Sequence, residues 1–170
     1  QTTLRTKLTP SMGTLGATSA RTRQANDDIG TITITADANY GVELKTLQIL
    51  FSGAALASAV PTAWTGLTLQ LIDSDTGGSI ISTTTVFHAT TTGLSMTLPT
   101  PFLVTQGTSK VFKLRVDSSN FTNAATAADS LSWQLGSTSA LTWSAQGNSA
   151  SETLNLETRI VPITSTVSYE

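Results

Sequence analysis

Few side chains in this chain are suited to acid–base or nucleophilic catalysis. The sequence has no Cys, a single His at position 88 and only 12% charged residues. Histidine exchanges protons readily near neutral pH, but His88 stands in Phe87-His-Ala-Thr-Thr, with no Ser in a nucleophile-elbow pattern nearby. Ser and Thr make up 53 of the 170 residues, so a hydroxyl close to an Asp is not informative. We expect that the chain is not an enzyme.

Carboxylates occur in two close pairs whose chemistry fits calcium. Ca²⁺ prefers oxygen ligands, and both pairs stand among turn-forming residues. The run Asp73-Ser-Asp-Thr-Gly-Gly lacks the spacing and the distal Glu of an EF-hand. Asp also favours turns for local hydrogen-bonding reasons, so turns without a metal are the alternative interpretation. The candidate calcium ligands are Asp27, Asp28, Asp73 and Asp75, and no other cofactor is expected.

One Trp suggests a site that binds sugars, and one Asn suggests a site to which a sugar is covalently attached. Trp133 and Trp143 each alternate with Leu or Ala two residues away, which predicts that both line the core of one hairpin. Trp64, near Pro61 in a predicted loop, is the candidate for an exposed glycan contact. Asn120, in Asn-Phe-Thr, matches the acceptor pattern for N-glycosylation.

Alternation of apolar and polar residues recurs along the chain and predicts half-buried β-strands. In 31–36 Thr alternates with Ile and Ala, and in 112–117 Phe, Leu and Val alternate with Lys, Arg and Asp. Thr is β-branched and suits the solvated face of a strand. About ten such strands with short loops, in a 17.7 kDa chain that fits one domain, predict an all-β fold. We expect a single β-sandwich of jelly-roll or immunoglobulin-like topology.

The alternation slips once in the first half of the chain. Val42 and Leu44 lie in one phase, whereas Leu47 and Ile49 lie in the other. One extra residue in a strand reverses the face on which all later side chains lie. The slip therefore predicts a β-bulge near Lys45 or, alternatively, a strand buried on both faces.

The first residues differ in kind from the rest of the chain. Leu4, Thr6 and Leu8 alternate with Arg and Lys, which predicts a short strand over Thr2 to Thr9 with a charged outer face. We expect Pro10 to end this strand. The pattern marks Leu4, Thr6 and Leu8 as candidate interaction residues.

A stretch rich in Gly, Ser, Thr and Ala follows, from Ser11 to Ala20, and its composition is typical of a flexible connector. A strand on such a connector can fold back, or it can complete a sheet in a neighbouring molecule by β-strand addition. We expect residues 1–20 to form a donor-strand extension with its connector and residues 21–170 to form the sandwich domain. An ordinary first strand in its own sheet is the alternative.

Charge and hydropathy exclude two classes of partner. The net charge is −2, the isoelectric point is near 5.3 and no run of Lys or Arg occurs, so nucleic-acid binding is not expected. No apolar stretch approaches the ~18 residues of a membrane-spanning helix. Gln1 does not begin a signal peptide, so the chain reads as a mature or excised segment. Because exported proteins can fold without disulfides, we expect an extracellular or cell-surface location.

Three stretches carry a resemblance to known proteins: Ile29-Gly-Thr-Ile-Thr-Ile-Thr-Ala-Asp37, Ser109-Lys-Val-Phe-Lys-Leu-Arg-Val-Asp117 and Leu154-Asn-Leu-Glu-Thr-Arg-Ile-Val-Pro-Ile163. They resemble β-sandwich modules in large secreted surface proteins of uncultivated, small-genome bacteria, over most of Ile29 to Glu170. That resemblance implies a structural or adhesive role at the cell surface and no catalytic residues. The N-terminal extension on a sandwich is also similar to donor-strand pilins and other extracellular filament subunits. The chain differs from chaperone-usher pilins in lacking their paired Cys.

Taken together, these features predict a structural subunit of an extracellular filament or surface layer that polymerises with itself by β-strand addition. The alternative is a cell-surface adhesive or carbohydrate-binding module whose glycan contact includes Trp64.

Overall fold

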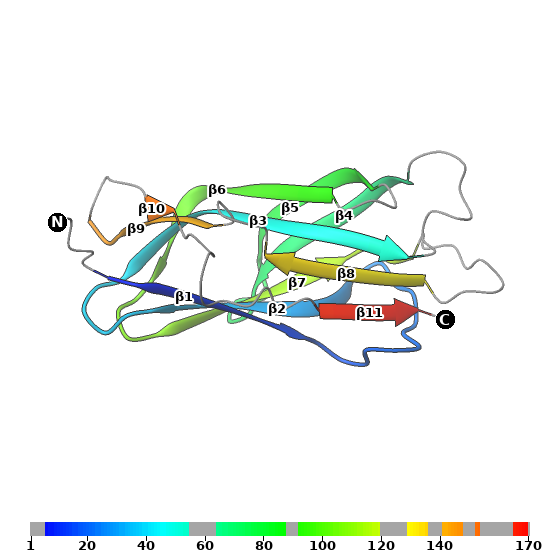
Figure 1. Ribbon diagram of the computed structural model, residues 1–170, viewed down its shortest axis with the longest axis horizontal. Coiled ribbons are helices and arrows are strands. Elements are labelled where there is room, and N and C mark those ends of the chain that lie inside the picture. The colour runs from blue at the N-terminus through cyan, green and yellow to red at the C-terminus, as the bar shows by residue number, and fades with distance from the viewer. Residues whose placement is uncertain are drawn as a thin grey trace.

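The computed structural model describes residues 6–54, 64–87, 92–119, 129–135, 141–147, 152–153 and 165–169. Every regular element in these ranges is a β-strand, so the predicted all-β class is confirmed for the described part of the chain (Figure 1). The strands pair antiparallel into two sheets. They are β1 (Leu8–Thr14), β2 (Asp27–Ala36), β3 (Val42–Ala54), β4 (Trp64–Asp73), β5 (Ser79–Phe87), β6 (Thr92–Val104), β7 (Ser109–Val116), β8 (Asp129–Leu135), β9 (Leu141–Ala145), β10 (Glu152–Thr153) and β11 (Ser165–Tyr169).

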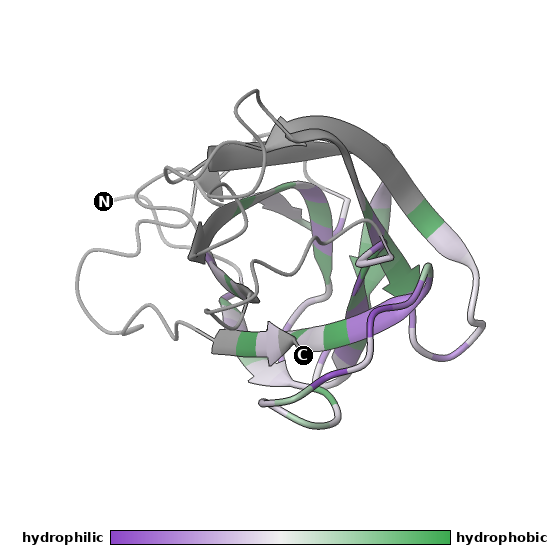
Figure 2. Ribbon diagram, turned by 90° about the vertical axis from the view of Figure 1, so that its right-hand side faces the viewer, coloured by the Kyte–Doolittle hydropathy of each residue, from purple (hydrophilic) through white to green (hydrophobic). Residues whose placement is uncertain are grey.

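Five strands form the first sheet in the order β1-β2-β7-β4-β5, so β1 and β5 are its edges. The alternation predicted in β2 is confirmed, since Ile32, Ile34 and Ala36 are buried while the Thr residues between them are only half-buried. In Figure 2 bands of hydrophobic colour are separated by paler or hydrophilic bands along several strands. Strand pairing places buried residues of neighbouring strands opposite each other: Ile32 of β2 lies opposite the buried Phe112 of β7.

The second sheet is built around the long strand β3. One side of β3 pairs with β6, while the other side pairs with β9 over residues 42–47 and with β8 over residues 49–54. β8 and β9 run in the same direction and lie end to end along β3, with β11 and β10 as their outer neighbours. The prediction that Trp133 and Trp143 share one hairpin is therefore wrong, because a hairpin requires the chain to reverse direction.

β3 contains the predicted bulge. Its register with β9 passes from Leu44 opposite Trp143 directly to Thr46 opposite Thr142, which leaves Lys45 as the extra residue. The buried positions switch from even to odd numbers at this point, so apolar side chains on both sides of the bulge reach the core. The prediction of a bulge near Lys45 is confirmed.

A second bulge, which the sequence did not predict, lies at Ile29 in β2. The register with β7 passes from Asp28 opposite Arg115 directly to Gly30. Before the bulge the buried residues are Asp27 and Ile29, and after it they are the even-numbered residues. The extra residue therefore places the carboxylate of Asp27 on the buried side of the strand.

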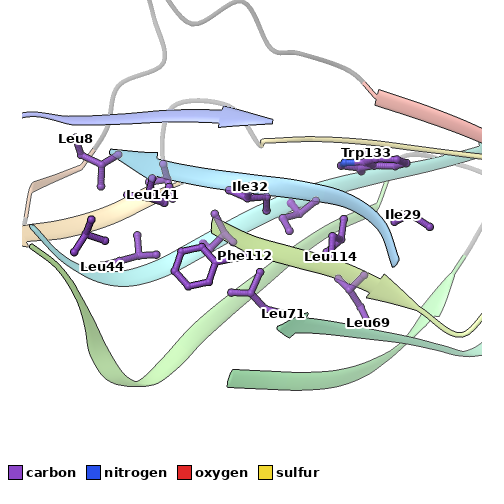
Figure 3. Close-up of a cluster of buried hydrophobic side chains, with 14 of the residues drawn as sticks. Leu8, Ile29, Ile32, Leu44, Leu69, Leu71, Phe112, Leu114, Trp133 and Leu141 are labelled. Atoms are coloured by element: carbon purple, nitrogen blue, oxygen red, sulfur yellow. The ribbon is translucent and has the colours of Figure 1, made fainter. Parts of the chain in front are cut away.

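Side chains from both sheets meet in one hydrophobic cluster (Figure 3). The largest fully buried side chain is Trp133 of β8, and it packs against β2 at Gly30. A Cβ atom at Gly30 would lie 2.6 Å from Cζ2 of Trp133 and 2.7 Å from the carbonyl oxygen of Gly13 in β1. The absence of a side chain at position 30 thus allows β1, β2 and the second sheet to approach one another.

We expect Gly30→Ala to lower the free energy of unfolding by about 1–3 kcal/mol, because the added methyl group overpacks the contact with Trp133. Denaturant unfolding followed by Trp fluorescence measures this change. Gly78→Ala is the matched control, since its Cβ would meet only Oγ1 of Thr76 at an ordinary 3.4 Å. The control should change stability by less than about 0.5 kcal/mol. Equal losses in the two variants would contradict the packing argument.

Candidate interaction site

The N-terminal strand β1 is an edge of the first sheet and pairs with β2 of its own chain. Leu8 is only 1% exposed and Pro10 is also buried, whereas Thr9 and Ser11 face solvent. The strand thus has one apolar face and one hydroxyl face. It runs through Pro10 to Thr14, so the prediction that Pro10 ends it is wrong. Proline lacks an N–H group and is tolerated on an edge strand.

The residues just before β1 are held on the turn between β2 and β3. Oγ1 of Thr6 donates a hydrogen bond to the carbonyl oxygen of Tyr40 at 2.8 Å, and the N–H of Asp37 donates to the carbonyl oxygen of Lys7 at 3.0 Å. Thr6 is buried. Leu4 lies outside the described residues. The two predicted interaction residues that the structure describes therefore contact their own chain.

One guanidinium group organises the connection between β1 and β2. Nη1 of Arg21 donates to the carbonyl oxygens of Leu15 at 2.6 Å and Ala17 at 2.7 Å. Nη2 donates to Oδ1 of Asp27 and, at 3.1 Å, to the carbonyl oxygen of Asp28. Nε donates to Oδ2 of Asp27 at 3.3 Å. A guanidinium has five N–H donors, and these bonds use each of them once.

The connector, defined as residues 15–26, is therefore tied to the body of the molecule by named bonds. A flexible stretch from Ser11 to Ala20 was predicted, but Ser11 to Thr14 continue β1 and Arg21 binds the turn that follows. Small residues such as Gly16 are typical of flexible segments, but here they let backbone carbonyls approach a guanidinium closely. The predicted boundary at residue 20 falls inside this connector.

The partner of Arg21 is a buried carboxylate. The side chain of Asp27 is 1% exposed and that of Arg21 is 10% exposed. Nε2 of Gln24 also donates to Oδ1 of Asp27, at 3.3 Å. Removing a carboxylate from water is costly unless a cation and hydrogen bonds compensate it, so Asp27 depends on Arg21. One feature of the sequence indicates that Asp27 is buried. Asp27 and the apolar Ile29 are two residues apart and so lie on the same face of the strand, whereas the buried residues after the bulge are the even-numbered ones.

The connector also joins the two sheets. The N–H of Arg21 donates to the carbonyl oxygen of Ser168 in β11, and the N–H of Ser168 donates to the carbonyl oxygen of Thr18, both at 3.0 Å. β1 itself lies beside β11 (Figure 1). Further along, the N–H of Gln24 donates to Oγ of Ser118 and the N–H of Ser118 donates to the carbonyl oxygen of Gln24, again at 3.0 Å. Ser118 follows β7, so the connector binds β2, β7 and β11.

Two of the calcium candidates, Asp73 at the end of β4 and Asp75 in the turn that follows, lie together, but they face an ammonium group. Nζ of Lys110 is 2.7 Å from Oδ1 of Asp73 and 2.5 Å from Oδ2 of Asp75. Nζ also lies 5.4 Å from the centre of the Phe102 ring, within the range of a cation–π contact. The N–H of Asp75 donates to Oδ1 of Asp73 at 2.9 Å, as in an Asp-stabilised turn. Lys110 thus stands where a metal cation would bind both carboxylates.

The other two candidates are separated by the strand itself. Asp28 accepts hydrogen bonds from Nε and Nη2 of Arg115, at 2.6 and 3.2 Å, and lies 3.8 Å from Nζ of Lys113. Asp27 is buried on the other side of β2, because neighbouring residues in a strand point to opposite faces. Among the described residues, no group of three or more His, Cys, Asp or Glu side chains could hold a metal ion.

The remaining candidates fall in three places. Trp133 and Trp143 are buried in the core, as predicted. Trp64 is the first residue of β4 and pairs with β5, so its predicted position in a loop is wrong, and its side chain lies outside the described part. His88 and Asn120 also lie outside the described residues.

A scan against protein-family models and a search of curated proteins gave no match for this chain. In the described ranges we find no helix that is both long and apolar enough to cross a membrane.

We expect acid to destabilise this protein partly through Asp73. Partial burial alone would raise the pKa of Asp73, but hydrogen bonds from Lys110 and the N–H of Asp75, with the charge of Lys110, hold it below the ordinary 3.8. Ionised Asp73 therefore stabilises the fold above pH ~4, and this stabilisation is lost as the pH falls through the folded-state pKa. Asp73→Asn keeps an oxygen acceptor for Asp75 but removes the charge.

The free energy of unfolding of both proteins should be measured by urea denaturation between about pH 6 and about pH 2.5. Asp73→Asn should lose less stability on acidification than the wild type. The same loss in both proteins would show that the contact between Asp73 and Lys110 does not contribute to acid sensitivity.

Proposed function

We propose that the two sheets form a single β-sandwich that serves as a structural subunit of an extracellular filament or surface layer. Copies of the chain associate when β1 leaves its own sheet and takes the same place beside β2 of a neighbour. Thr6 and Leu8 belong to the exchanged segment, and the partner is a second copy of this chain. Leu4 completes the set of candidate interaction residues and lies outside the described residues.

The observation that carries this proposal is the length of the connection after an edge strand. β1 and β2 pair as neighbours, and such pairs are ordinarily joined by about 2–5 residues. Here 12 residues, 15–26, separate Thr14 from Asp27. Fully extended, a segment of that length spans about 40 Å, which is enough to reach an adjacent molecule. A hairpin with so long a connection can close within one chain or between two.

Exchange requires no new recognition surface. Leu8 and Pro10 would enter the same apolar positions in the neighbour, and the main-chain bonds to β2 would re-form in the same register. If each subunit gives β1 to the next and receives one from the previous, the contact is heterologous. Repetition of such a contact produces an open filament rather than a closed dimer.

The solvated face of the first sheet also suits a structural role outside the cell. Thr9, Thr35 and Ser109 form one row across β1, β2 and β7, and Oγ1 of Thr35 is 2.7 Å from Oγ of Ser109. Hydroxyl rows keep the face hydrated without adding net charge. The chain has no Cys, so it folds without disulfides in an oxidising environment.

A disulfide between β1 and β2 should prevent assembly. Thr9 and Thr35 are opposite each other in the antiparallel pair, and such Cα atoms lie about 4.5–5.5 Å apart, within the range for a disulfide. We expect the oxidised Thr9→Cys/Thr35→Cys variant to remain monomeric and the reduced variant to form polymers like the wild type. Electron microscopy and size-exclusion chromatography measure this. Polymers built from the oxidised, internally linked chain, or monomers in every state including the wild type, would contradict strand exchange.

Mixing two single-Cys proteins tests the exchange directly. When Thr9→Cys chains and Thr35→Cys chains are mixed under oxidising conditions, exchange places the two thiols side by side and a disulfide-linked heterodimer should appear on a non-reducing gel. Thr35→Cys mixed with Ser109→Cys is the matched control, because β2 and β7 are neighbours inside the sheet and neither is exchanged. A heterodimer yield no higher than that of the control would argue against exchange of β1.

A further inference from the structure

For β1 to leave its own sheet, the connector must open either before or after Arg21. Hydrogen bonds of Arg21 oppose opening at both places. If the chain opens before Arg21, the carbonyl oxygens of Leu15 and Ala17 lose their bonds to Nη1. If it opens after Arg21, Asp27 and the carbonyl oxygen of Asp28 lose their bonds to Nη2 and Nε. Exchange at either place breaks part of the same five-bond group.

The second of these routes also uncovers a charge. Asp27 is fully buried, so its carboxylate would be left without its cation while the connector is open. The backbone pairing of Thr18 and Arg21 with Ser168 would be lost as well, which exposes the edge of β11. Gln24 is bound to Ser118 on the body of the molecule, and these bonds would also have to open before all 12 connector residues could extend.

We propose that the Arg21–Asp27 pair is a latch that keeps β1 on its own chain and so sets the rate at which copies exchange strands. The inference rests on the proposed function. While Arg21 holds both Asp27 and the carbonyl oxygens of the connector, a newly made subunit remains a closed monomer, and assembly begins when the bonds on one side of Arg21 open. After exchange the pair re-forms, which closes the connector around the new junction.

Arg21→Lys tests the number of donors while keeping the charge. A lysine ammonium has three donors and no planar fork, so it cannot bind Asp27 at two oxygens and also reach the carbonyl oxygens of Leu15, Ala17 and Asp28. Arg21→Gln removes the charge as well. Both substitutions are placed in the Thr9→Cys and Thr35→Cys chains, and the initial rate of heterodimer formation is measured on mixing. We expect each substitution of Arg21 to raise this initial rate about tenfold or more relative to the same chains with Arg21 unchanged.

Leu69→Ala in the same two chains is the control for general destabilisation. Leu69 is fully buried in β4, which two strands separate from β1. The rates are compared at temperatures where the variants are equally far below their unfolding midpoints. In the Arg21→Lys chain, amide hydrogen exchange should accelerate in β1 and the connector but not in β7, whereas Leu69→Ala should accelerate it in β4 and β7.

Three outcomes separate the latch from the function on which it rests. Faster exchange in the Arg21 variants than in Leu69→Ala supports the latch. Heterodimers that form at one rate in all variants would leave strand exchange standing and overturn the latch. If no heterodimer forms even in Arg21→Lys and Arg21→Gln chains that are folded by circular dichroism, both proposals are wrong.

Discussion

The one-residue bulge at Ile29 determines how the N-terminal part of the chain is attached to the rest. Without it, Asp27 would share the solvated face with the Thr residues of β2; with it, the carboxylate lies inside. A buried carboxylate needs a cation that can satisfy both oxygens, and Arg21 does so while its other donors hold the connector. A change of register in one strand therefore fixes the path of a segment that touches both sheets.

The bulges at Lys45 and Ile29 show when the alternation of apolar and polar residues predicts which side chains are buried. The alternation predicts burial correctly in β3, but in β2 it assigns Asp27 to the wrong face. At Lys45 the residues on both sides of the slip are apolar, so the change of phase is visible in the sequence. At Ile29 the residue before the slip is Asp27, and a charged residue is ordinarily assigned to solvent. The sequence shows that Asp27 and Ile29 lie on the same face of the strand. It does not show that Arg21, six residues earlier in the connector, is the partner of Asp27.

Strand pairing and side-chain partners depend on contacts that spacing does not encode. The burial of Trp133 and Trp143 followed from local alternation, whereas their pairing in a hairpin failed because β3 is long enough to carry β8 and β9 in succession. Likewise, the sequence makes Asp73 and Asp75 candidate metal ligands, but in the structure the ammonium group of Lys110, distant in sequence, occupies the position of the cation. The alternation around Leu8 predicts its burial but not the chain that buries it, because either copy offers the same apolar positions.

A hydroxyl-rich sheet face favours association at strand edges over association face to face. A face lined by Thr33, Thr35 and Ser11 is already well hydrated, so covering it with another molecule buries little apolar surface and displaces bound water. An edge strand is different, since its free N–H and C=O groups bond to any extended segment of suitable register. At the β1 edge every copy carries the same segment, so under the proposed exchange the closed and exchanged forms would have nearly the same contacts. Because the Arg21–Asp27 pair belongs to the closed form and would re-form after the proposed exchange, it would set the rate of exchange rather than the balance between the two forms.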